Sequence, residues 1–582
     1  MDNIFESFSL KDLPFSFKKN SLDENIFINF NGNIYNKSQL SSLVNLEKSI
    51  DIKLLLLALY KMYKKDMFEK LEGIFTISIY DKETKKLYLA RDRVGLKTIY
   101  LYTNNDRLIF GNTLSDFYKD ENFNKTIDKN ALALFLSYGY VLQPYTIFEN
   151  TVKVKSGHYI EYDIDKKTFL QQPYWKLESC YEEKKPIITE KEVLNQAQEL
   201  LYKSISKRFD EKAPLASSLS GGYDSSIVAA LLSKNSTKKL NTFTIGFEQD
   251  EINEAHHAKK IAAHLKSDHH EHYFSDKDAI EIVPKLSEVY DEPFADYGAT
   301  PTVLMSMLVK KAGFDTLYVG DGGDEVFATA DDVAKFDKIL NIPHSGKMAL
   351  YTMLNTINPL KIPFIKSYQN LPTKYYKFLQ ILKSKTVADM VKAKPILFFD
   401  KEIELLLKRD DISFKTVFDE IDFPKNAQTV DQVIGCYFKT TMVDAELVKS
   451  FQATRYSDIT IKEPLLDKDL INFMAKVPSH IKIKDGIKKY ILKEIAHQHI
   501  PKELLDRPKS GFDIPFSHWL KGPLKELLYE NINEKRLEEE NLFDTNMILE
   551  IRDKFYNGNE SYKYKLWTIF LFQLWYKKIQ SR

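Results

Sequence analysis

The 582-residue chain has little of the chemistry on which several classes of protein depend. Its two cysteines, Cys180 and Cys436, are too few to stabilise a chain of this length by disulfide bonds or to build a zinc site from cysteine pairs. Its 83 basic and 82 acidic side chains leave a formal charge of +1, without the basic excess of a nucleic-acid-binding protein. The longest apolar runs, 54–60 and 566–576, are shorter than the roughly 20 residues that a membrane helix needs. No secretory signal is visible at the start of the sequence, so we expect a cytoplasmic protein that binds neither nucleic acid nor membranes.

The first part of the chain has the pattern of a β-rich domain. The runs 75–80 and 86–90 are rich in β-branched and aromatic residues and flank the turn-like segment 81–84, which predicts a β-hairpin. The segment 50–63 contains a leucine run and favours a helix that is buried on more than one side. The charged stretch 182–186 interrupts the pattern, and we expect it to link this domain to a second one.

Strands and helices alternate in the second part of the chain. Thr189, with Glu192 three residues later, predicts a capping box at the start of a helix. Strand-like and helix-like segments then follow in turn, at 215–219, 227–232, 241–247 and 255–265. This order predicts a parallel sheet that helices cover on both faces. Residues 335–440 have a mostly helical and less regular pattern.

A glycine- and serine-rich turn joins the first of these strands to the next helix. It has the sequence S-G-G-Y-D-S-S, and its candidate phosphate contacts are Ser220, Gly221, Gly222, Asp224, Ser225 and Ser226. The glycines let the backbone approach an anion closely, and the helix that follows offers free N–H groups. The serines add hydroxyl donors, and Asp224 can hold Mg²⁺ against phosphate oxygens. The Gly-Lys-Ser/Thr ending of a Walker loop is absent, so the sequence predicts a phosphate site of another kind.

This loop resembles the pyrophosphate loop of N-type ATP pyrophosphatases. Six further motifs narrow the resemblance to the asparagine synthetase family, which includes β-lactam synthetase and lasso-peptide cyclase branches. These motifs lie in family order at 242–247, 291–301, 320–327, 464–467, 488–493 and 507–512. The resemblance implies a parallel-sheet, adenine-nucleotide α-hydrolase-like synthetase domain at 187–582, with a variable helical segment at about 335–440 and a helical C-terminal part.

The resemblance also implies ATP and Mg²⁺ as cofactors and a reaction in two steps. The carboxylate of a small molecule or a peptide attacks the α-phosphate of ATP and releases pyrophosphate. An amine then displaces AMP and forms an amide. Pyrophosphate leaves with a high negative charge, so a metal ion and N–H donors must hold it.

The expected nucleotide site draws on several of these motifs. By the resemblance, Asp224 and Asp324 are expected to ligate Mg²⁺, and Lys489 to lie near phosphate. A turn residue and a surface lysine are the alternative interpretations of Asp324 and Lys489. Ile245 lies in the strand that resembles the lining of the adenine site, and Gly320 opens the G-D-G-G-D-E motif.

Three further residues are the expected catalytic groups. Lys509 resembles the family lysine that stabilises negative charge in the transition states, although a solvated lysine is the alternative. By the resemblance, Asp321 occupies the position where family members place a tyrosine, glutamate or aspartate close to the reacting amine. We interpret Glu446 as a candidate general base, with an ordinary carboxylate on a helix face as the alternative.

Four departures from the family pattern lie on or near the part that would hold the acceptor substrate. Phe327-Ala328-Thr329-Ala330 stands in place of F-G-G-Y, Val319 in place of a serine, Thr460-Ile461-Lys462 in place of E-x-R, and Phe451 in place of an aspartate. The phosphate loop itself is intact. We therefore predict retained adenylation and an altered substrate.

The first domain resembles a glutaminase without its nucleophile. The segments 31–36, 71–75 and 91–97 resemble the oxyanion segment and later core motifs of class II amidotransferases. Asp2 stands where glutamine-hydrolysing members have cysteine, and no cysteine precedes Cys180, so no thiolate is available to attack glutamine. The oxyanion segment also comes early, which indicates that the strands before it are deleted. We predict a degenerate Ntn-type amidotransferase-like α+β domain at 1–181, so ammonia or a substrate amine supplies the nitrogen.

Other features carry less weight. Six histidines between 256 and 272 invite a zinc interpretation, but their spacing matches no ligand set. The aromatic segment 567–575 predicts a buried helix or a docking helix, and a homodimer or a partner protein stays open. The leading hypothesis is an ATP-dependent amide-forming ligase. The alternatives are an ammonia-dependent asparagine synthetase and a non-catalytic ATP-binding scaffold.

Overall fold

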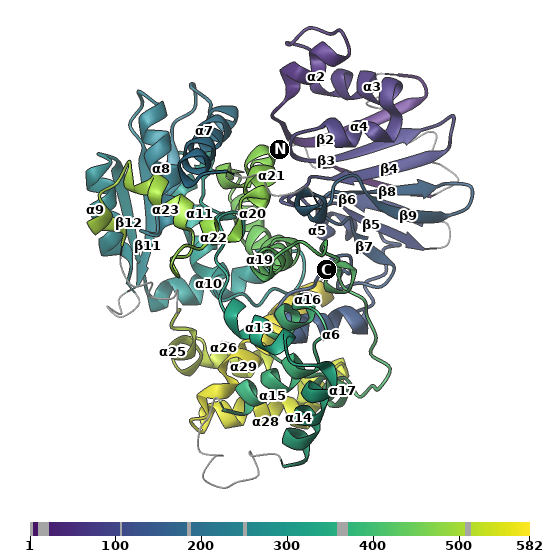
Figure 1. Cartoon of the computed structure of the whole chain (residues 1–582). Helices are drawn as coiled ribbons and strands as arrows, with labels where there is room; N and C mark the ends of the chain where they lie inside the picture. Colours follow the sequence, from purple (N-terminus) through teal and green to yellow (C-terminus); the bar gives the residue numbers. More distant parts are fainter. Residues whose placement is uncertain are drawn as a thin grey trace. The chain divides into compact units, whose positions relative to one another are not determined.

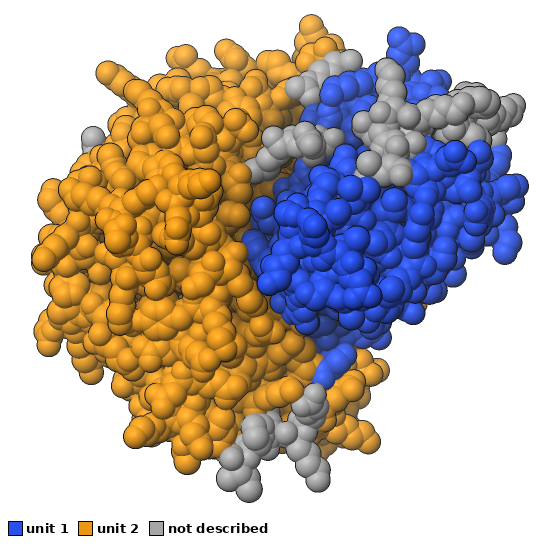
Figure 2. All heavy atoms as spheres, turned by 90° about the horizontal axis from the view of Figure 1, so that it is seen from above, with its two compact units in different colours: residues 1–131, 142–179, 582 blue, residues 132–141, 180–581 orange. Residues whose placement is uncertain are grey.

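The computed structural model divides the chain into two compact units. It describes all residues except 1–3, 10–22, 105–106, 183–187, 248–252, 358–370, 507–513 and 582. The first unit holds residues 1–131 and 142–179, and the second holds residues 132–141 and 180–581 (Figure 2). The predicted linker at 182–186 lies almost entirely outside the described residues. Among the described residues, no helix is long and apolar enough to cross a membrane.

Two antiparallel sheets form the framework of the first unit. One has five strands in the order β2-β3-β4-β8-β9, and the other has four in the order β1-β6-β5-β7. The strands are β1 (Phe5–Ser9), β2 (Ile26–Ile34), β3 (Gly73–Asp81), β4 (Lys86–Arg91), β5 (Tyr100–Asn104), β6 (Arg107–Gly111), β7 (Thr151–Lys153), β8 (His158–Asp163) and β9 (Thr168–Pro173). The predicted hairpin is confirmed, because β3 pairs antiparallel with β4 and places Ile79 opposite Tyr88.

The five-stranded sheet buries apolar side chains on both faces. On one face, side chains such as Leu89 pack with Leu101 and Leu108 of the four-stranded sheet. On the other face the sheet packs against α2 (Lys37–Leu43), α3 (Ile52–Tyr63) and α4 (Met67–Lys70). Leu55 and Leu56 are fully buried, which confirms the predicted helix with more than one buried side. The described part of this unit also contains α5 (Leu114–Phe117) and the start of α6 (Lys129–Tyr138), whose later residues belong to the second unit.

The second unit contains the predicted parallel sheet. Its five strands have the order β12-β11-β10-β13-β14, and all neighbours are parallel. They are β10 (Ala216–Ser218), β11 (Asn241–Phe247), β12 (Asp268–Phe274), β13 (Thr316–Tyr318) and β14 (Thr460–Lys462). Around them lie α7 (Glu190–Arg208), α8 (Tyr223–Asn235), α9 (Ala255–His264), α10 (Asp276–Val289) and α11 (Ala299–Lys311). The capping box of Thr189 and Glu192 is present at the start of α7.

The strand order creates a topological switch point between β10 and β13. From β10 the chain passes outward through α8 to β11 and through α9 to β12, and α9 lies beside these two strands (Figure 1). It then crosses back through α10 and α11 to β13, on the other side of β10. Open parallel sheets bind their ligands at the carboxyl ends of strands that flank such a point. The loops after β10 and β13 are therefore the natural place for a site.

The rest of the second unit is helical. Before β14 lie α12 (Gly323–Val326), α13 (Val333–Leu340), α14 (His344–Thr356), α15 (Leu371–Lys383), α16 (Val387–Ala393), α17 (Asp400–Leu407), α18 (Val417–Glu420), α19 (Thr429–Lys439) and α20 (Leu447–Tyr456). After β14 lie α21 (Lys468–Lys476), α22 (Ser479–Lys482), α23 (Tyr490–His497), α24 (Lys502–Leu505), α25 (Phe516–Lys521), α26 (Lys525–Asn531), α27 (Glu534–Glu540), α28 (Thr545–Tyr556) and α29 (Lys563–Gln580).

The C-terminal helix α29 is a buried helix of this unit. Trp567 and Trp575 are almost fully buried. Their indole N–H groups donate to the carbonyl oxygens of Ala295, at 3.1 Å, and Asp291, at 3.3 Å. These two hydrogen bonds attach the aromatic segment to the family motif at 291–301. The segment is a buried helix, as predicted.

Candidate active site

The loop after β10 is braced by its own serines. The backbone N–H of Ser220 donates to Oγ of Ser225 at 3.1 Å, and the two hydroxyl oxygens lie 3.0 Å apart. Ser220 is exposed, whereas Ser226 is fully buried and its N–H donates to the carbonyl of Gly222 at 3.1 Å. Of the three predicted hydroxyl donors, the structure therefore places Ser220 toward solvent and Ser226 in the interior.

The loop after β13 packs directly against the phosphate loop. A Cβ on Gly320 would lie 2.6 Å from the backbone nitrogen of Ser225, closer than any real side chain. A Cβ on Gly323 would overlap the carboxylate of Asp224. Gly320 and Gly323 of this motif are thus needed for two strand-end loops to meet, a role that the sequence pattern did not distinguish from anion binding.

Lys489 lies between the two predicted metal ligands. Its Nζ is 2.5 Å from Oδ2 of Asp224 and 2.7 Å from Oδ1 of Asp324. Only 8% of the lysine is exposed, so it is not a surface lysine. Burial by itself would lower the pKa of Lys489, but the two carboxylates outweigh it and raise the pKa. One ammonium group therefore joins residues from the two loops and from the start of α23.

A second charged cluster surrounds Lys449 on α20. Its Nζ lies 2.5 Å from Oε2 of Glu446 and 3.4 Å from Oδ2 of Asp296. Burial opposes the charge, but these carboxylates and Asp321 raise the pKa of Lys449. Glu446 ends a π-helical turn, Met442–Glu446, a form that is frequent at functional sites.

Asp321 lies between the two clusters. Burial, with the charges of Glu446 and Asp224, raises its pKa to about 6, although Ser450 and Lys449 act in the opposite direction. Glu446 and Asp321 are thus close enough to influence each other, as their proposed roles require. Asp321 as a whole residue is half-buried, but the Oδ2 atom of its carboxyl group is buried.

Two acidic residues were missed as site residues by the sequence analysis. Asp296 pairs with Lys449, and burial together with the charge of Asp324 raises the pKa of Glu325 to about 8. Both lie inside motifs that the resemblance had marked, but nothing in their spacing set them apart. Only the fold brings them to the same place as the predicted groups.

The remaining predicted residues lie in different settings. Ile245 is buried in β11, the strand next to β10, beyond the stretch where the two strands pair. Lys509 falls within residues 507–513 and lies outside the described residues. The histidines near β12 contact neighbouring side chains: His269 lies 2.9 Å from Thr242, and His272 lies 3.1 Å from Asp278.

The residues present fit a magnesium polyphosphate. Among the described residues no group of three or more histidine, cysteine, aspartate or glutamate side chains could hold a metal ion. Asp224 and Asp324 together supply two carboxylates, and Mg²⁺ in phosphate sites commonly takes one or two carboxylates and completes its shell with phosphate oxygens and water. The N–H groups at the start of α8, next to Asp224, offer further donors to an anion.

Several departures from the family pattern are buried residues, and the carbonyl of one of them, Ala328, accepts from the N–H of Lys489 at 3.2 Å. Phe327, Ala328, Val319 and Phe451 are all less than one-tenth exposed. The N–H of Val319 donates to the carbonyl of Lys462 at 3.0 Å, which joins the ends of β13 and β14. These substitutions therefore alter the packing behind the site.

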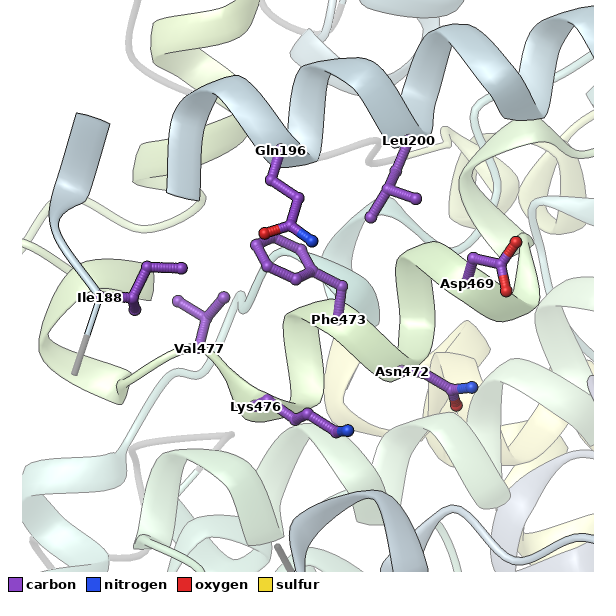
Figure 3. A pocket seen from close by; sticks show the side chains of 8 residues that line it. All are labelled: Ile188, Gln196, Leu200, Asp469, Asn472, Phe473, Lys476 and Val477. Carbon is purple, nitrogen blue, oxygen red and sulfur yellow. The ribbon is translucent and has the colours of Figure 1, made fainter. Parts of the chain in front are cut away.

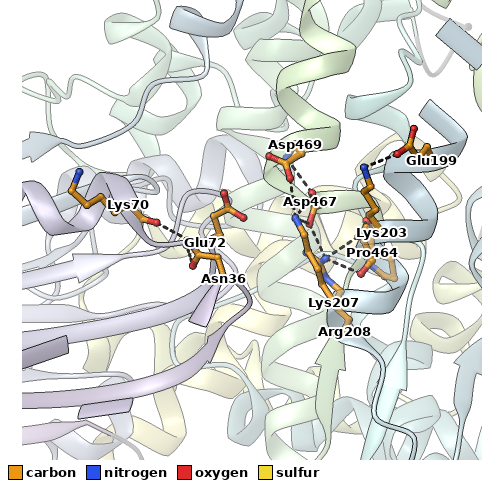
Figure 4. A network of polar contacts seen from close by, with 11 residues as sticks. Asn36, Lys70, Glu72, Glu199, Lys203, Lys207, Arg208, Pro464, Asp467 and Asp469 are labelled. Carbon is orange, nitrogen blue, oxygen red and sulfur yellow. Dashed lines mark hydrogen bonds and ion pairs between the residues drawn. The ribbon is translucent and has the colours of Figure 1, made fainter. Parts of the chain in front are cut away.

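The P-L-L-D motif anchors β14 to α7. Asp467 accepts from Arg208 at 3.1 Å and from Lys207 at 3.4 Å, and Ser204 donates to the carbonyl of Pro464 (Figure 4). A cavity of about 500 Å³ lies nearby between α7 and α21, lined by Ile188, Gln196, Leu200, Asp469, Asn472, Phe473, Lys476 and Val477 (Figure 3). None of the predicted site residues lines it, so it is separate from the candidate active site.

In the first unit, the last residue of the oxyanion-like segment 31–36 makes hydrogen bonds that stabilise the fold. Asn36 donates to the carbonyl of Lys70 at 2.8 Å and accepts from the N–H of Glu72 at 3.0 Å (Figure 4). The end of the oxyanion-like segment is thus fixed to the start of the next core motif.

A parallel sheet with two close-packed, glycine-rich loops at its switch point is typical of nucleotide-binding α/β domains. Comparison with known proteins makes the class more specific. The family described as asparagine synthase matches residues 196–577, and the glutamine amidotransferase domain matches residues 14–175. The chain therefore belongs to the asparagine synthase family, whose members are ATP-dependent carbon–nitrogen ligases.

Two relatives illustrate the match. A putative glutamine-hydrolyzing asparagine synthetase 2 of Methanocaldococcus jannaschii is 34% identical over 53% of this chain and 60% of its own length. The glutamine-hydrolyzing asparagine synthetase 1 of Bacillus subtilis is 27% identical over 95% of this chain and 86% of its own. A solved glutamine phosphoribosylpyrophosphate amidotransferase from B. subtilis covers 52% of this chain and 63% of its own at 13% identity, with a TM-score of 0.19, too low to support an argument.

Proposed function

We propose that this protein adenylates the carboxylate of a specific acceptor with ATP and joins it to ammonia or to a substrate amine, without hydrolysing glutamine. The observation that carries the proposal is the meeting of Asp224, Asp324 and Lys489 at the switch point of the parallel sheet. These groups come from three separate segments of the chain, and all three belong to motifs shared with the family.

On the phosphate side, the two carboxylates and the lysine would exchange binding partners when Mg²⁺ and phosphate bind. Asp224 and Asp324 would hold Mg²⁺, which neutralises the charge that develops on the leaving pyrophosphate. Lys489 now neutralises these two carboxylates, so it is free to turn to phosphate oxygens once the metal ion takes its place. The N–H groups at the start of α8 offer further donors to the same anion.

The acceptor side would orient the amine. Asp321 and Glu446 are the candidate proton acceptors, and Lys449 holds Glu446 in place through a 2.5 Å ion pair. An attacking amine must lose a proton, and a carboxylate whose pKa is raised toward neutrality is a better acceptor for it. The raised pKa of Asp321 supports this role.

The amine source follows from the first unit. The printed sequence has no cysteine among its first 179 residues, so the amidotransferase-like unit contains no thiol nucleophile. Asp2 itself lies outside the described residues. The relatives named above are described as glutamine-hydrolyzing, and this proposal separates the present chain from them.

The test is release of AMP and pyrophosphate from Mg-ATP with ammonium, across a panel of carboxylates headed by aspartate. We expect turnover with one class of acceptor and none with glutamine as the only nitrogen source. Asp324→Ala should abolish the acceptor-dependent release of AMP and pyrophosphate. Asp315→Ala is the matched control, because Asp315 is a largely exposed residue just before β13 that pairs only at the surface with Lys310.

Asparagine synthesis from ammonia is the second candidate, because both relatives named above are asparagine synthetases. Aspartate-dependent AMP release with asparagine formed would establish it. ATP binding without turnover on any carboxylate would favour a scaffold instead. Glutamine-dependent turnover would overturn the proposed loss of glutaminase activity.

A further inference from the structure

Tyr223 lies in the phosphate loop between Gly222 and Asp224, and its side chain packs against α23. Its hydroxyl lies 3.1 Å from Nε2 of His497, and the two rings meet edge to face with centroids 5.7 Å apart. The ammonium of Lys493 lies over the tyrosine ring, 5.0 Å from its centroid. All of these partners belong to α23.

Lys489 is the N-cap residue of α23, and Lys493 and His497 follow it at intervals of four residues. Lys493 and His497 therefore lie on one face of the helix that Lys489 begins. Asp224 holds Lys489 at the beginning of this helix, and Tyr223 holds Lys493 and His497 further along it. Two consecutive residues of the phosphate loop therefore fix both ends of the helix that carries Lys489.

We propose that Tyr223 is a positioning residue that sets the orientation of α23, so that Lys489 is presented to a polyphosphate bound at the loop. The proposal rests on the proposed function, because it takes the loop to bind phosphate. The Tyr223–His497 contact also persists when Lys489 leaves its carboxylates, since it involves neither of them. The helix would then keep its place while the lysine changes partners.

Burial supports this arrangement. It lowers the pKa of His497 below its ordinary value, with a partly opposing effect of Glu494. A neutral imidazole can accept a hydrogen bond at Nε2 from the tyrosine hydroxyl.

The chain offers a matched control. Tyr202 on α7 lies 3.5 Å from Nε2 of His499, the rings meet edge to face, and Lys234 lies over the tyrosine ring at 5.5 Å. This second group has the same composition, but it joins α7 to His499, just beyond α23, and to Lys234 of α8, and it includes no residue of the phosphate loop. Tyr202→Phe therefore tests the loss of a tyrosine–histidine contact in general.

The experiment measures binding of magnesium pyrophosphate by calorimetry to the full chain and to Tyr223→Phe, Tyr202→Phe, Lys489→Met and the Tyr223→Phe/Lys489→Met double variant. We expect Tyr223→Phe to weaken binding about threefold to tenfold, the value of one neutral hydrogen bond. Tyr202→Phe should bind as the wild type does. In the Lys489→Met background, Tyr223→Phe should cause no further loss, because its effect acts through the lysine.

Three outcomes would overturn the proposal. Equal losses from Tyr223→Phe with and without Lys489 would mean that the tyrosine acts independently of the lysine. Unchanged binding by Tyr223→Phe, with at most a lower melting temperature, would leave it a structural residue only. Failure of the wild type to bind magnesium pyrophosphate would instead remove the proposed function of the loop, and the positioning role with it.

Discussion

The phosphate side and the acceptor side of the candidate site differ in what shapes them. On the phosphate side the backbone of one loop lies against that of another, and Gly320 leaves no room for a single added carbon. On the acceptor side the shape comes from buried side chains such as Val319 and Phe451 and from the charges around Lys449. Of the four departures from the family pattern, Phe451 lies on α20 together with Lys449, whereas the carbonyl of Ala328 accepts from the N–H of Lys489 on the phosphate side. A close contact between two backbone segments does not tolerate replacement of its glycine by a larger residue. Buried side chains, in contrast, can be substituted and repacked around a new acceptor.

The electrostatics of the two sides differ as well. Lys489 is shared by two carboxylates, an arrangement that a metal ion and a phosphate can replace without leaving any charge unpaired. Lys449 has Asp296 and Glu446 as partners and Asp321 nearby, and this cluster includes a carboxyl group of raised pKa. We therefore propose that ion-pair partners exchange on the phosphate side and that a proton is held or released on the acceptor side.

The largest expected effect is that of Gly320→Ala. The new Cβ would lie 2.6 Å from the nitrogen of Ser225, so the two loops must move apart. A displacement of about 1 Å at a catalytic group can cost about a hundredfold, and we expect at least that loss in magnesium pyrophosphate affinity. Gly346→Ala, within α14 and next to a movable isoleucine side chain, is the control and should leave affinity unchanged. Normal binding by Gly320→Ala would contradict the close-packing argument.

The second prediction concerns stability against pH. Asp321 has a folded pKa of about 6 against an ordinary value of 3.8, so the folded state binds more protons between these values. Its stabilising contribution is then complete below about pH 4 and is lost as the pH rises through 6, by at most about 3 kcal/mol. Denaturation of the wild type and Asp321→Asn from pH 4.5 to 7 should show this decline in the wild type only. Parallel profiles would place Asp321 in an ordinary, solvated environment.

The third prediction tests the neighbours of Asp321. The charge of Glu446 raises the pKa of Asp321 and that of Lys449 lowers it. Glu446→Gln should therefore shift the decline in stability to lower pH, and Lys449→Met should shift it to higher pH. Each shift should be below about one unit, or about 1 kcal/mol. Shifts in the same direction would show that the three groups do not form one cluster.

Local signals allowed much of the fold to be predicted. The strand predicted at 241–247 is β11, and the Thr189 capping box begins α7, because strand composition and helix caps depend on neighbouring residues alone. The phosphate loop could be placed for the same reason. The charged contacts could not, since Lys449 and Asp296 are 153 residues apart and Lys489 and Asp224 are 265 apart.

Two further features had no signal in the sequence. The π-helical turn that ends at Glu446 depends on how α19 continues into α20, and residue patterns with a period of 3.6 predict an uninterrupted helix there. The grouping of residues 132–141 with the second unit depends on tertiary packing. The roles of the catalytic candidates came from the family resemblance alone, and they remain predictions.

The smallest expected effect is that of Val319→Ser, which restores the family residue directly beside Gly320. Val319 is only 7% exposed, and its N–H bond to the carbonyl of Lys462 does not involve the side chain. We therefore expect a loss of stability of about 0.5–3 kcal/mol from poorer packing. Magnesium pyrophosphate affinity should stay within about twofold of the wild type, less than 0.5 kcal/mol. If Gly320→Ala loses affinity and Val319→Ser does not in the same calorimetry, the boundary between the phosphate side and the acceptor side lies between residues 319 and 320. A large loss of affinity in Val319→Ser would move that boundary and make the serine-to-valine exchange part of the phosphate site.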